Sequence, residues 1–546
     1  WCLRPAHLLS VGPLFLAASG LALAACGGNA AVRPPAPAAV CDAPVRDVDT
    51  SRTPARIGRG DPAGCTEAAL RREVARGGAI TFDCGPHPAT IVVRSTVVVP
   101  ADRDTVIDGG GRITLDGRHG ARILSLEHEG YRTNRHGLTL QHIALINGRA
   151  PRAGFVLQDV RHPSCAFGYP ASGGGAAVSV RDARLHVIDV EFRDNAAATP
   201  GPDVGGGAIY ALASLDVTIV NSRFVGNTGA NGGALGLLQS NARIYDSRFE
   251  SNRANGIGMN YVEGDSCVGV GHPGQGGAGG NGGAISMDGI DDDEQVICGS
   301  WFVGNRANEL AGAIFRASNI APRPTRIDHS HFERNSAREG GALFVVNADP
   351  VEILSSSFRH NHARTIGAAQ IERSRVRVEN STFTRNTATS GIGGALFLAN
   401  IHAGSVVRNA TFADNRADGG AGFFGAAIVA SGNFGVYNTV FANNTTRDSG
   451  SPMQCAGTAT GADNVQWPPD RLVGVAADRP CVAGIRFADP RLGRTSREGA
   501  GTIALVPQSD SPLLRAGRDC PAVDQWDRPR DAAGCTIGSL EGGGPD

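Results

Sequence analysis

Four side chains that could bind a ligand occupy the same position in successive repeats of the chain. They are Arg223, Arg248, Trp301 and His331, and each directly precedes a phenylalanine. Neighbouring residues of a strand point to opposite sides, so a buried phenylalanine places the preceding residue on the outer surface. An exposed indole can stack on a sugar ring, and guanidinium groups bind carboxylates. The four residues therefore form a candidate contact surface for an acidic carbohydrate, unless residues 256–281 fold over Trp301 and bury it.

Cleavage of a polysaccharide is an alternative chemistry, for which the sequence offers few groups. Elimination beside a uronate carboxylate needs a base, and a cation that neutralises the developing charge. All 51 basic residues are arginine, so no lysine can supply either role. Asp291-Asp292-Asp293-Glu294 could bind calcium, although an acidic run beside Gly289 is more typical of a solvated turn. His142, His329 and His331 are interpreted as surface residues rather than bases, so no catalytic residue, metal site or cofactor is predicted.

A repeat positions the four candidate residues. Nine copies of Phe-x-x-Asn alternate with copies of Gly-Gly-Ala followed by an aliphatic residue. Most intervals between the phenylalanines fall between 25 and 32 residues, which is the period of a solenoid coil. The phenylalanines are Phe192, Phe224, Phe249, Phe302, Phe332, Phe358, Phe383, Phe412 and Phe441.

Residues 206–227 illustrate one coil. Leu215, Val217 and Ile219 alternate with outward positions, which is typical of a half-buried strand, and Phe224 resumes an inward position. Stacked coils place equivalent residues roughly 4.8 Å apart, so the phenylalanines, the asparagines and the aliphatic residues should form three ladders. The aliphatic ladder comprises Ile209, Leu235, Ile285, Ile314, Leu343, Gln370, Leu396 and Ile428, with Gln370 as its one break. The sequence predicts an all-β fold, a single right-handed parallel β-helix over residues 61–480.

Both ends of such a solenoid expose unpaired strand edges and need a cover. A short N-terminal capping helix is predicted from Thr66, its N-cap, to Gly77, which lies past its end. Residues 481–546 contain two candidate disulfides and are predicted to form a stapled C-terminal cap. Residues 149–175 and 256–281 break the repeat and are interpreted as long turns that project from one side.

The N-terminus has the pattern of an export signal. Arg4 begins a short basic region, and an apolar stretch over residues 8–25 ends in Leu23-Ala24-Ala25-Cys26. This ending resembles the lipobox of bacterial lipoproteins, which implies lipidation of Cys26; Gly27 after it implies sorting to the outer membrane. The alternative is an ordinary secretory signal that happens to contain Cys26. A signal peptide is predicted over residues 1–25 and a disordered tether over residues 26–60.

Cysteine usage agrees with export. Ten cysteines remain when Cys2 and Cys26 are set aside, and an even number in an exported chain indicates disulfides. Pairing of neighbours predicts Cys65–Cys84, Cys267–Cys298, Cys455–Cys481 and Cys520–Cys535, and leaves Cys41 with Cys165. None of these pairs has the C-x-x-C spacing of a zinc site.

Composition limits the partners. The net charge is −1, so a nucleic acid is not expected to bind. Glycine accounts for 75 of 546 residues and is spread through the repeats, as a coil with many tight turns requires.

Two segments resemble known families. Cys65-Thr-Glu-Ala-Ala-Leu, Ile80-Thr-Phe-Asp-Cys84-Gly and Thr105-Val-Ile-Asp-Gly-Gly-Gly are similar to the opening of exported bacterial right-handed β-helix repeat proteins. The ending from Ser511 through Cys520-Pro-Ala-Val-Asp524-Gln525 to Cys535-Thr-Ile-Gly-Ser-Leu-Glu541 resembles the choice-of-anchor Q domain. The repeats also look like those of polymorphic outer-membrane proteins. The resemblance covers about residues 60–541 and implies the fold, but carries over no catalytic residue.

These patterns together favour a lipid-anchored protein of the cell envelope that recognises carbohydrate or another cell's surface. The pectin-lyase-like superfamily of β-helices also contains polysaccharide lyases and glycosidases, so an enzyme is the first alternative. A purely structural envelope protein is the second. The membrane, through the N-terminal lipid, and a polysaccharide are the expected partners.

Overall fold

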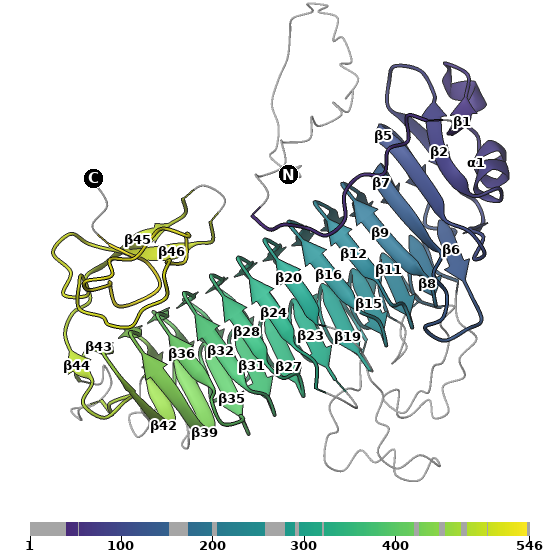
Figure 1. Ribbon diagram of the computed structural model, residues 1–546. Helices are drawn as coiled ribbons and strands as arrows, with labels where there is room; N and C mark the ends of the chain where they lie inside the picture. The colour runs from purple at the N-terminus through teal and green to yellow at the C-terminus, as the bar shows by residue number, and fades with distance from the viewer. Residues whose placement is uncertain are drawn as a thin grey trace, which may run out of the picture. The chain divides into compact units, whose positions relative to one another are not determined.

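The chain folds into an all-β, right-handed parallel solenoid of about 12 turns (Figure 1). The computed structural model describes residues 40–542 apart from residues 53, 152–172, 199–204, 257–278, 290–293, 319–321, 420–424, 447–453, 471–477 and 499–500. In the described residues α1 (Glu67–Val74) is the one α-helix, and it is preceded by the 3-10 helix η1 (Pro62–Gly64). No helix within these residues has the length and apolarity needed to span a membrane. The predicted fold class is confirmed.

Each coil contributes strands to as many as four parallel rows, and strands of one row pair in register from coil to coil. The first row contains β4 (Val97–Val98), β6 (Leu124–Glu127), β8 (Val178–Arg181), β11 (Ile209–Leu212), β15 (Leu235–Leu238), β19 (Ile285–Asp288), β23 (Ile314–Ala317), β27 (Leu343–Val346), β31 (Ala369–Glu372) and β35 (Leu396–Ala399). The second row contains β1 (Ala55–Gly58), β2 (Gly78–Asp83), β9 (Arg184–Ile188), β12 (Val217–Val220), β16 (Ala242–Tyr245), β20 (Gln295–Cys298), β24 (Thr325–Asp328), β28 (Val351–Leu354), β32 (Val376–Glu379) and β36 (Val406–Arg408).

The third row carries the repeated phenylalanines. It contains β3 (Ala89–Val92), β10 (Glu191–Arg193), β13 (Arg223–Val225), β17 (Arg248–Glu250), β21 (Trp301–Val303), β25 (His331–Glu333), β29 (Ser357–Arg359), β33 (Thr382–Thr384), β37 (Thr411–Ala413), β40 (Val440–Ala442), β43 (Val465–Trp467) and β44 (Arg486–Phe487). The short fourth row contains β14 (Thr228–Gly229), β18 (Arg253–Ala254), β22 (Arg306–Ala307), β26 (Ser336–Ala337), β30 (His362–Ala363), β34 (Thr387–Ala388), β38 (Arg416–Ala417) and β41 (Thr445–Thr446).

Six further strands complete the fold. β5 (Thr105–Asp116) and β7 (Gly137–Ile146) run through the second and third rows, whereas β39 (Ile428–Tyr437) and β42 (Cys455–Ala462) run through the first and second. The antiparallel hairpin of β45 (Leu492–Ser496) and β46 (Ala504–Pro507) lies outside the coils. The continuous strands join the first three rows into one 36-stranded sheet.

The nine phenylalanines stack as predicted. All nine are fully buried, and neighbouring rings lie nearly parallel with centroids 4.6 Å apart at the closest pair and 5.6 Å at the widest. Each ring fills the interior directly against the ring of the next coil. A single residue type therefore supplies much of the core without the varied shapes of a globular interior.

The asparagines that follow the phenylalanines form a second buried ladder. Asn305 Nδ2 donates to Asn335 Oδ1 at 3.0 Å and to the carbonyl of Phe249 at 2.9 Å. The backbone amide of Asn305 also donates to Asn335 Oδ1. Both amide hydrogens are thus satisfied, and each carbonyl oxygen receives two bonds, which removes the cost of burying the group. The predicted asparagine ladder is confirmed.

The aliphatic ladder contains a different residue from the one predicted. Ala369 lies in register with Leu343 and Leu396, whereas Gln370 pairs with Phe344 and Phe397 on the outer side. The assignment of Gln370 to the ladder was wrong because this coil has a single glycine, Gly367, so the spacing from the repeat shifts by one residue. The interior row therefore has no polar break here.

The corner between the second and third rows, called the upper corner, repeats a left-handed backbone. Its residues are His142, Asp189, Asn221, Asp246, Gly299, His329, Ser355, Asn380, Asn409, Asn438 and Asp463, and all have φ between 44° and 64°. Asparagine and aspartate tolerate this conformation better than other side chains, apart from glycine. Their use leaves a line of polar groups along one edge of the solenoid.

The N-terminal capping helix forms as predicted. Thr66 caps α1 by accepting a hydrogen bond from the amide of Ala69 at 3.2 Å. Leu70 and Val74 are fully buried and belong to the same core cluster as the coils. The helix therefore covers the first coil with apolar side chains.

The residues before this helix form an ordered strap. Residues 40–52, the N-terminal strap, run along the upper corner above the second row (Figure 1). Val48 exchanges two hydrogen bonds with the side chain of Gln141, and Thr50 Oγ1 donates to Asp108 at 2.7 Å. The prediction of a disordered tether over residues 26–60 is therefore wrong for residues 40–52 and for β1. Composition does not reveal these distant partners.

Four disulfides lie within the described residues, and one of them anchors the strap. Cys65–Cys84, Cys455–Cys481 and Cys520–Cys535 are confirmed. Cys41 pairs with Cys298 across 257 residues, so the predicted pairs Cys267–Cys298 and Cys41–Cys165 are wrong. Pairing of neighbours failed because the strap returns to the middle of the solenoid. Cys165 and Cys267 lie outside the described residues.

The predicted C-terminal cap covers the last coil with only a few residues. Most of it packs along the side of the solenoid. Cys481 and Val482 join the core cluster at the last coil. Residues 488–542, the C-terminal segment, then turn back over the upper corner (Figure 1). Thr502 Oγ1 donates to the carbonyl of Ser355 at 2.8 Å, and Asn380 Nδ2 donates to that of Val523 at 2.9 Å. The segment packs across several coils because their corner residues offer hydrogen-bonding groups.

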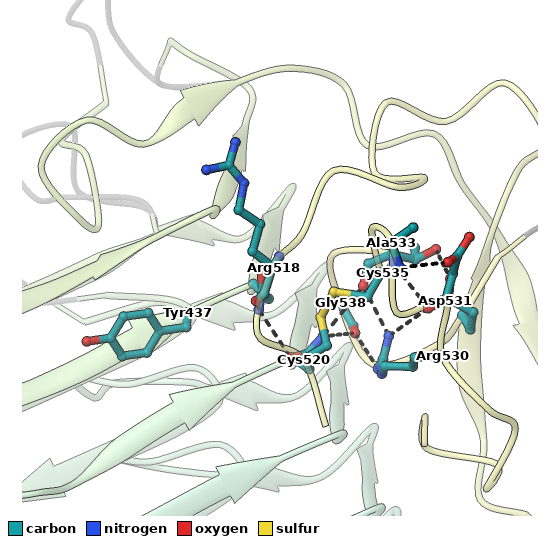
Figure 2. Close-up of a disulfide and its surroundings, with 12 residues drawn as sticks. Tyr437, Arg518, Cys520, Arg530, Asp531, Ala533, Cys535 and Gly538 are labelled. Carbon is teal, nitrogen blue, oxygen red and sulfur yellow. Dashed lines mark hydrogen bonds and ion pairs between the residues drawn. A yellow bond between two sulfur atoms is a disulfide. The ribbon is translucent and has the colours of Figure 1, made fainter. Parts of the chain in front are cut away.

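Arg530 holds the C-terminal segment together beside the Cys520–Cys535 disulfide (Figure 2). Its guanidinium donates to the carbonyl of Gly538 at 3.0 Å, to Asn380 Oδ1 at 2.9 Å and to Glu541 Oε2 at 3.2 Å. Burial lowers the pKa of Arg530, although the charge of Glu541 opposes this. The residues that resemble the choice-of-anchor Q ending thus support structure rather than a surface site.

We expect Phe332→Ala to destabilise the solenoid by about 3–5 kcal/mol, because it empties a fully buried position in the ring stack. The midpoint of urea denaturation, followed by circular dichroism, measures this change. Phe487→Ala is the matched control, since the Phe487 side chain is 38% exposed and should cost much less. Equal shifts for the two variants would contradict the stacked core.

Candidate functional site

The four candidate residues lie in one register, as the repeat predicted. Arg223 pairs with Arg248, Arg248 with Trp301, and Trp301 with His331. Their exposure nevertheless differs. Arg223 and Arg248 are exposed, Trp301 is half-buried, and His331 is fully buried. The candidate surface therefore ends at Trp301.

Trp301 is half-buried and packed against other side chains, rather than open as a flat platform. The guanidinium carbon of Arg248 lies 5.7 Å from its ring centroid, and that of Arg497 lies 4.8 Å away. The ring of His331 packs against it at 4.4 Å with a tilt of 54°. Residues 257–278, most of the predicted covering turn, lie outside the described residues. Two guanidiniums and one imidazole therefore pack against an indole that is still partly exposed.

Arg497 is a contact that the sequence analysis missed. It belongs to the C-terminal segment, 196 residues after Trp301 in the chain. No local pattern connects the two positions. The cation–π contact joins the end of the chain to the middle of the solenoid.

Glu250 fixes the two exposed arginines. Arg223 Nη2 lies 2.7 Å from Glu250 Oε2, and Arg248 Nε also bonds this carboxylate. Burial tends to raise the pKa of Glu250, but the hydrogen bond from Arg223 and the charge of Arg248 outweigh it and lower the pKa. One carboxylate thus serves two guanidiniums, so this part of the surface keeps a net positive charge.

His331 cannot contact a ligand, contrary to the prediction. Its Nδ1 lies 2.6 Å from Ser357 Oγ and its Nε2 lies 3.3 Å from Glu333 Oε2. Burial lowers the pKa of His331, so the imidazole is neutral, with Nε2 donating and Nδ1 accepting. The hydrogen bond with His331, followed by the charges of Arg334 and Arg359, lowers the pKa of Glu333. His331 is a structural residue beneath the site.

The C-terminal segment causes this burial. From β25 onward the outward residue of the third row is buried in every coil through β40: His331, Ser357, Thr382, Thr411 and Val440. Thr382 Oγ1 donates to Gln525 Oε1 at 2.7 Å and lies 2.8 Å from Ser539 Oγ. A signal for this cover exists in the sequence, because the outward residues change there from arginine and tryptophan to serine, threonine and valine.

Within the described part of the chain, the other histidines that the sequence analysis considered lie in ion pairs with carboxylates. His329 is bound on both ring nitrogens, at 2.8 Å to Asp328 and 2.9 Å to Asp527, and His142 lies between Asp47 and Asp108. Both rings are half-buried at the upper corner and are engaged by carboxylates. Cys298, Asp328 and His329 each place one possible ligand atom within 4.8 Å of the others. The disulfide to Cys41 consumes the thiolate, so this cluster offers only two ligands. Residues 291–293, part of the acidic run, lie outside the described residues.

Comparison with known proteins identifies no activity for this chain. No family model matches it, and no curated protein matches it. The chain is similar to a PL6 alginate lyase solved in complex with a trisaccharide, with 14% identity, a TM-score of 0.41, and coverage of 85% of this chain and 92% of that one. It is also similar to the alginate lyase AlyF-OU02 with G6, at 14% identity, a TM-score of 0.41, and coverage of 85% and 93%. Similarities this weak support no functional argument.

We expect the buried, neutral His331 to cost stability in acid. The unfolded chain binds a proton near pH 6.5, whereas the folded chain binds it only at a lower pH, so stability falls as pH decreases below about 6.5. His331→Gln should remove up to about 1.4 kcal/mol per pH unit from this dependence. Urea midpoints between pH 7 and pH 5 measure it.

His329→Gln is the control with the opposite sign. Burial opposes the charge of His329, but the hydrogen bond and charge of Asp328 and the charge of Asp527 outweigh it and raise the pKa. The stability that His329 contributes is therefore present below the unfolded pKa and is lost as pH rises through the folded pKa. An unchanged acid limb in His331→Gln would show that His331 is charged in the folded protein.

Proposed function

We propose that the protein recognises an acidic polysaccharide at the exposed part of its third row, around Trp301, Arg248 and Arg223. The observation that supports this most is the convergence of the Arg248 and Arg497 guanidiniums on the indole. Guanidinium groups bind carboxylates through two parallel hydrogen bonds, and the exposed part of the indole offers an apolar contact to sugar C–H groups. Acidic sugars present both features together.

The arginines are held ready for such a ligand. Cation–π contacts of this kind contribute about 0.5–1 kcal/mol each at exposed sites and restrict the long side chains. Glu250 restrains Arg223 and Arg248 further. Less conformational entropy is then lost when the ligand binds, which favours affinity on an open surface.

Binding is a better proposal than cleavage for this site. A lyase needs a base beside the cations that neutralise the uronate carboxylate. The imidazole next to Trp301 belongs to His331, which is sealed from solvent and engaged by Ser357 and Glu333. Incubation with uronate polymers tests the alternative, because elimination produces an unsaturated sugar that absorbs ultraviolet light.

The site would act at the cell envelope. Lipidation at Cys26, a signal peptide over residues 1–25 and sorting to the outer membrane remain predictions from the sequence, since residues 1–39 lie outside the described part. The four disulfides among the described residues support an oxidising compartment outside the cytoplasm. The resemblance to choice-of-anchor Q proteins is likewise a proposal, consistent with export.

We expect Trp301→Ala and Arg248→Gln each to weaken binding to polygalacturonate about fivefold, because each removes a contact worth about 1 kcal/mol. Isothermal titration calorimetry measures the affinity, and circular dichroism confirms that the fold is retained. Arg377→Gln on the second row is the control, because that side chain is similarly exposed but pairs with Glu352 and Glu379. Unchanged affinity in both site variants would remove this proposal.

We expect Cys26→Ala to abolish lipid attachment and release the protein from the membrane, because no other cysteine follows the apolar stretch closely. Expression in a bacterium with metabolic labelling by a fatty-acid analogue measures the attachment. Retention of label in the variant would contradict lipidation at Cys26.

A further inference from the structure

A band of basic side chains, five of them exposed arginines, follows the corner between the third and fourth rows. We call Arg253, Arg306, Arg334, His360, Arg385 and Arg416 the cationic band. Each comes from one of six successive coils, as the pairing of β18, β22, β26, β30, β34 and β38 shows. The five arginines are exposed and His360 is half-buried. Five of the six coils therefore present an exposed guanidinium, and the coil of His360 presents a half-buried imidazole.

The band occupies two outward positions of the coil, one on each side of the buried asparagine ladder. Arg253 lies directly beside Arg306 in the fourth row. Arg334, His360 and Arg385 lie two residues earlier in their coils, at a corner position where all three have a left-handed backbone with φ of 53°, 53° and 56°. Successive coils are roughly 4.8 Å apart, so the six residues extend along about 24 Å of the solenoid axis.

Carboxylates neutralise only part of the band. Arg334 lies 3.1 Å from Glu333, Arg385 lies 3.6 Å from Asp414, and Arg416 lies 2.7 Å from Asp418. Within the residues that the structure describes, Arg253 and Arg306 have no carboxylate partner. Two guanidiniums that stack without a counter-charge repel each other, and a bound anion would relieve this repulsion.

The band continues the proposed polysaccharide site. Arg253 follows Arg248 in one coil, and Arg306 follows Trp301 in the next. Beyond Trp301 the C-terminal segment covers the outward residues of the third row, but the corner beside it stays exposed at Arg334 and Arg385. A chain that contacts Trp301 can therefore continue past the covered part of the third row over this corner.

We propose that the cationic band binds a linear acidic polysaccharide that lies along the solenoid axis, with its carboxylate or sulfate groups beside successive coils. This inference rests on the proposed function and extends it from one contact site to a track of six coils. His360 fits this role as a neutral member, because burial and the charges of Arg359 and Arg385 lower its pKa and Glu333 and Arg334 also face it. A bound polyanion would favour its protonation.

The test compares the double variant Arg253→Gln/Arg306→Gln with the wild-type full chain. The probes are polygalacturonate for carboxylates, dextran sulfate for sulfates, neutral dextran, and single-stranded DNA as a polyanion of another class. Affinity is measured across a series of salt concentrations. We expect the double variant to bind at least one acidic polysaccharide about tenfold more weakly at low salt, and with a shallower salt dependence, because two charge contacts are lost.

The matched control is Arg59→Gln/Arg135→Gln. Both residues are exposed and lack a carboxylate partner among the described residues, so the variant has the same change of charge away from the band. It should bind like the wild type. Equal weakening in the two double variants would mean that net charge alone matters, and would overturn the band.

The outcomes separate the two proposals. If Trp301→Ala weakens binding but Arg253→Gln/Arg306→Gln leaves affinity and salt dependence unchanged, the contact site stands and the band fails. If the wild type binds neither acidic polysaccharide, both fail. Equally tight binding of DNA would overturn the assignment to polysaccharide. The band is supported by one result. The wild type and the control double variant bind polygalacturonate or dextran sulfate, and Arg253→Gln/Arg306→Gln binds it more weakly.

Discussion

In-register stacking of the coils is the constraint on which the rest of the structure depends. Successive coils are one strand spacing apart. A residue type that recurs at one position of the repeat therefore contacts the same residue type in the coils above and below. Phenylalanine then fills the interior, and asparagine satisfies its amide along the axis. The same rule operates on the outside, where it places arginine beside arginine at Arg253 and Arg306. Stacking is favourable for apolar and amide groups, whereas stacked guanidinium groups repel each other, and a bound anion would reduce this repulsion.

The upper corner shows how one backbone requirement creates a second feature. A left-handed bend in each coil favours asparagine or aspartate, whose side chains then point polar groups outward. Both ends of the chain use them: Val40 bonds Asp246, and the C-terminal segment bonds Asn380 and Asn438. The two segments occupy the same edge of the solenoid, and His329 with Asp527 lies where they approach each other. The surface available to a ligand is what these segments leave uncovered.

The candidate site was predicted in part. The spacing of the phenylalanines was enough to place Arg223, Arg248 and Trp301 in one outward register, since side chains alternate along a strand. It was not enough to predict that His331 is buried or that Arg497 contacts Trp301. Both depend on a segment far away in the chain, and repeat spacing contains no information on what packs against the repeat from outside.

The sequence by itself determined the coil: the strands, the stacked phenylalanines, the asparagine ladder, the capping helix and three disulfides between neighbouring cysteines. These features are local or periodic, so a pattern within one or two coils specifies them. The tertiary structure alone decided the path of the strap, the Cys41–Cys298 disulfide and the half of the third row that the C-terminal segment covers. Those contacts join residues separated by hundreds of positions through individual hydrogen bonds and side-chain packing, for which a single sequence has no repeating signal.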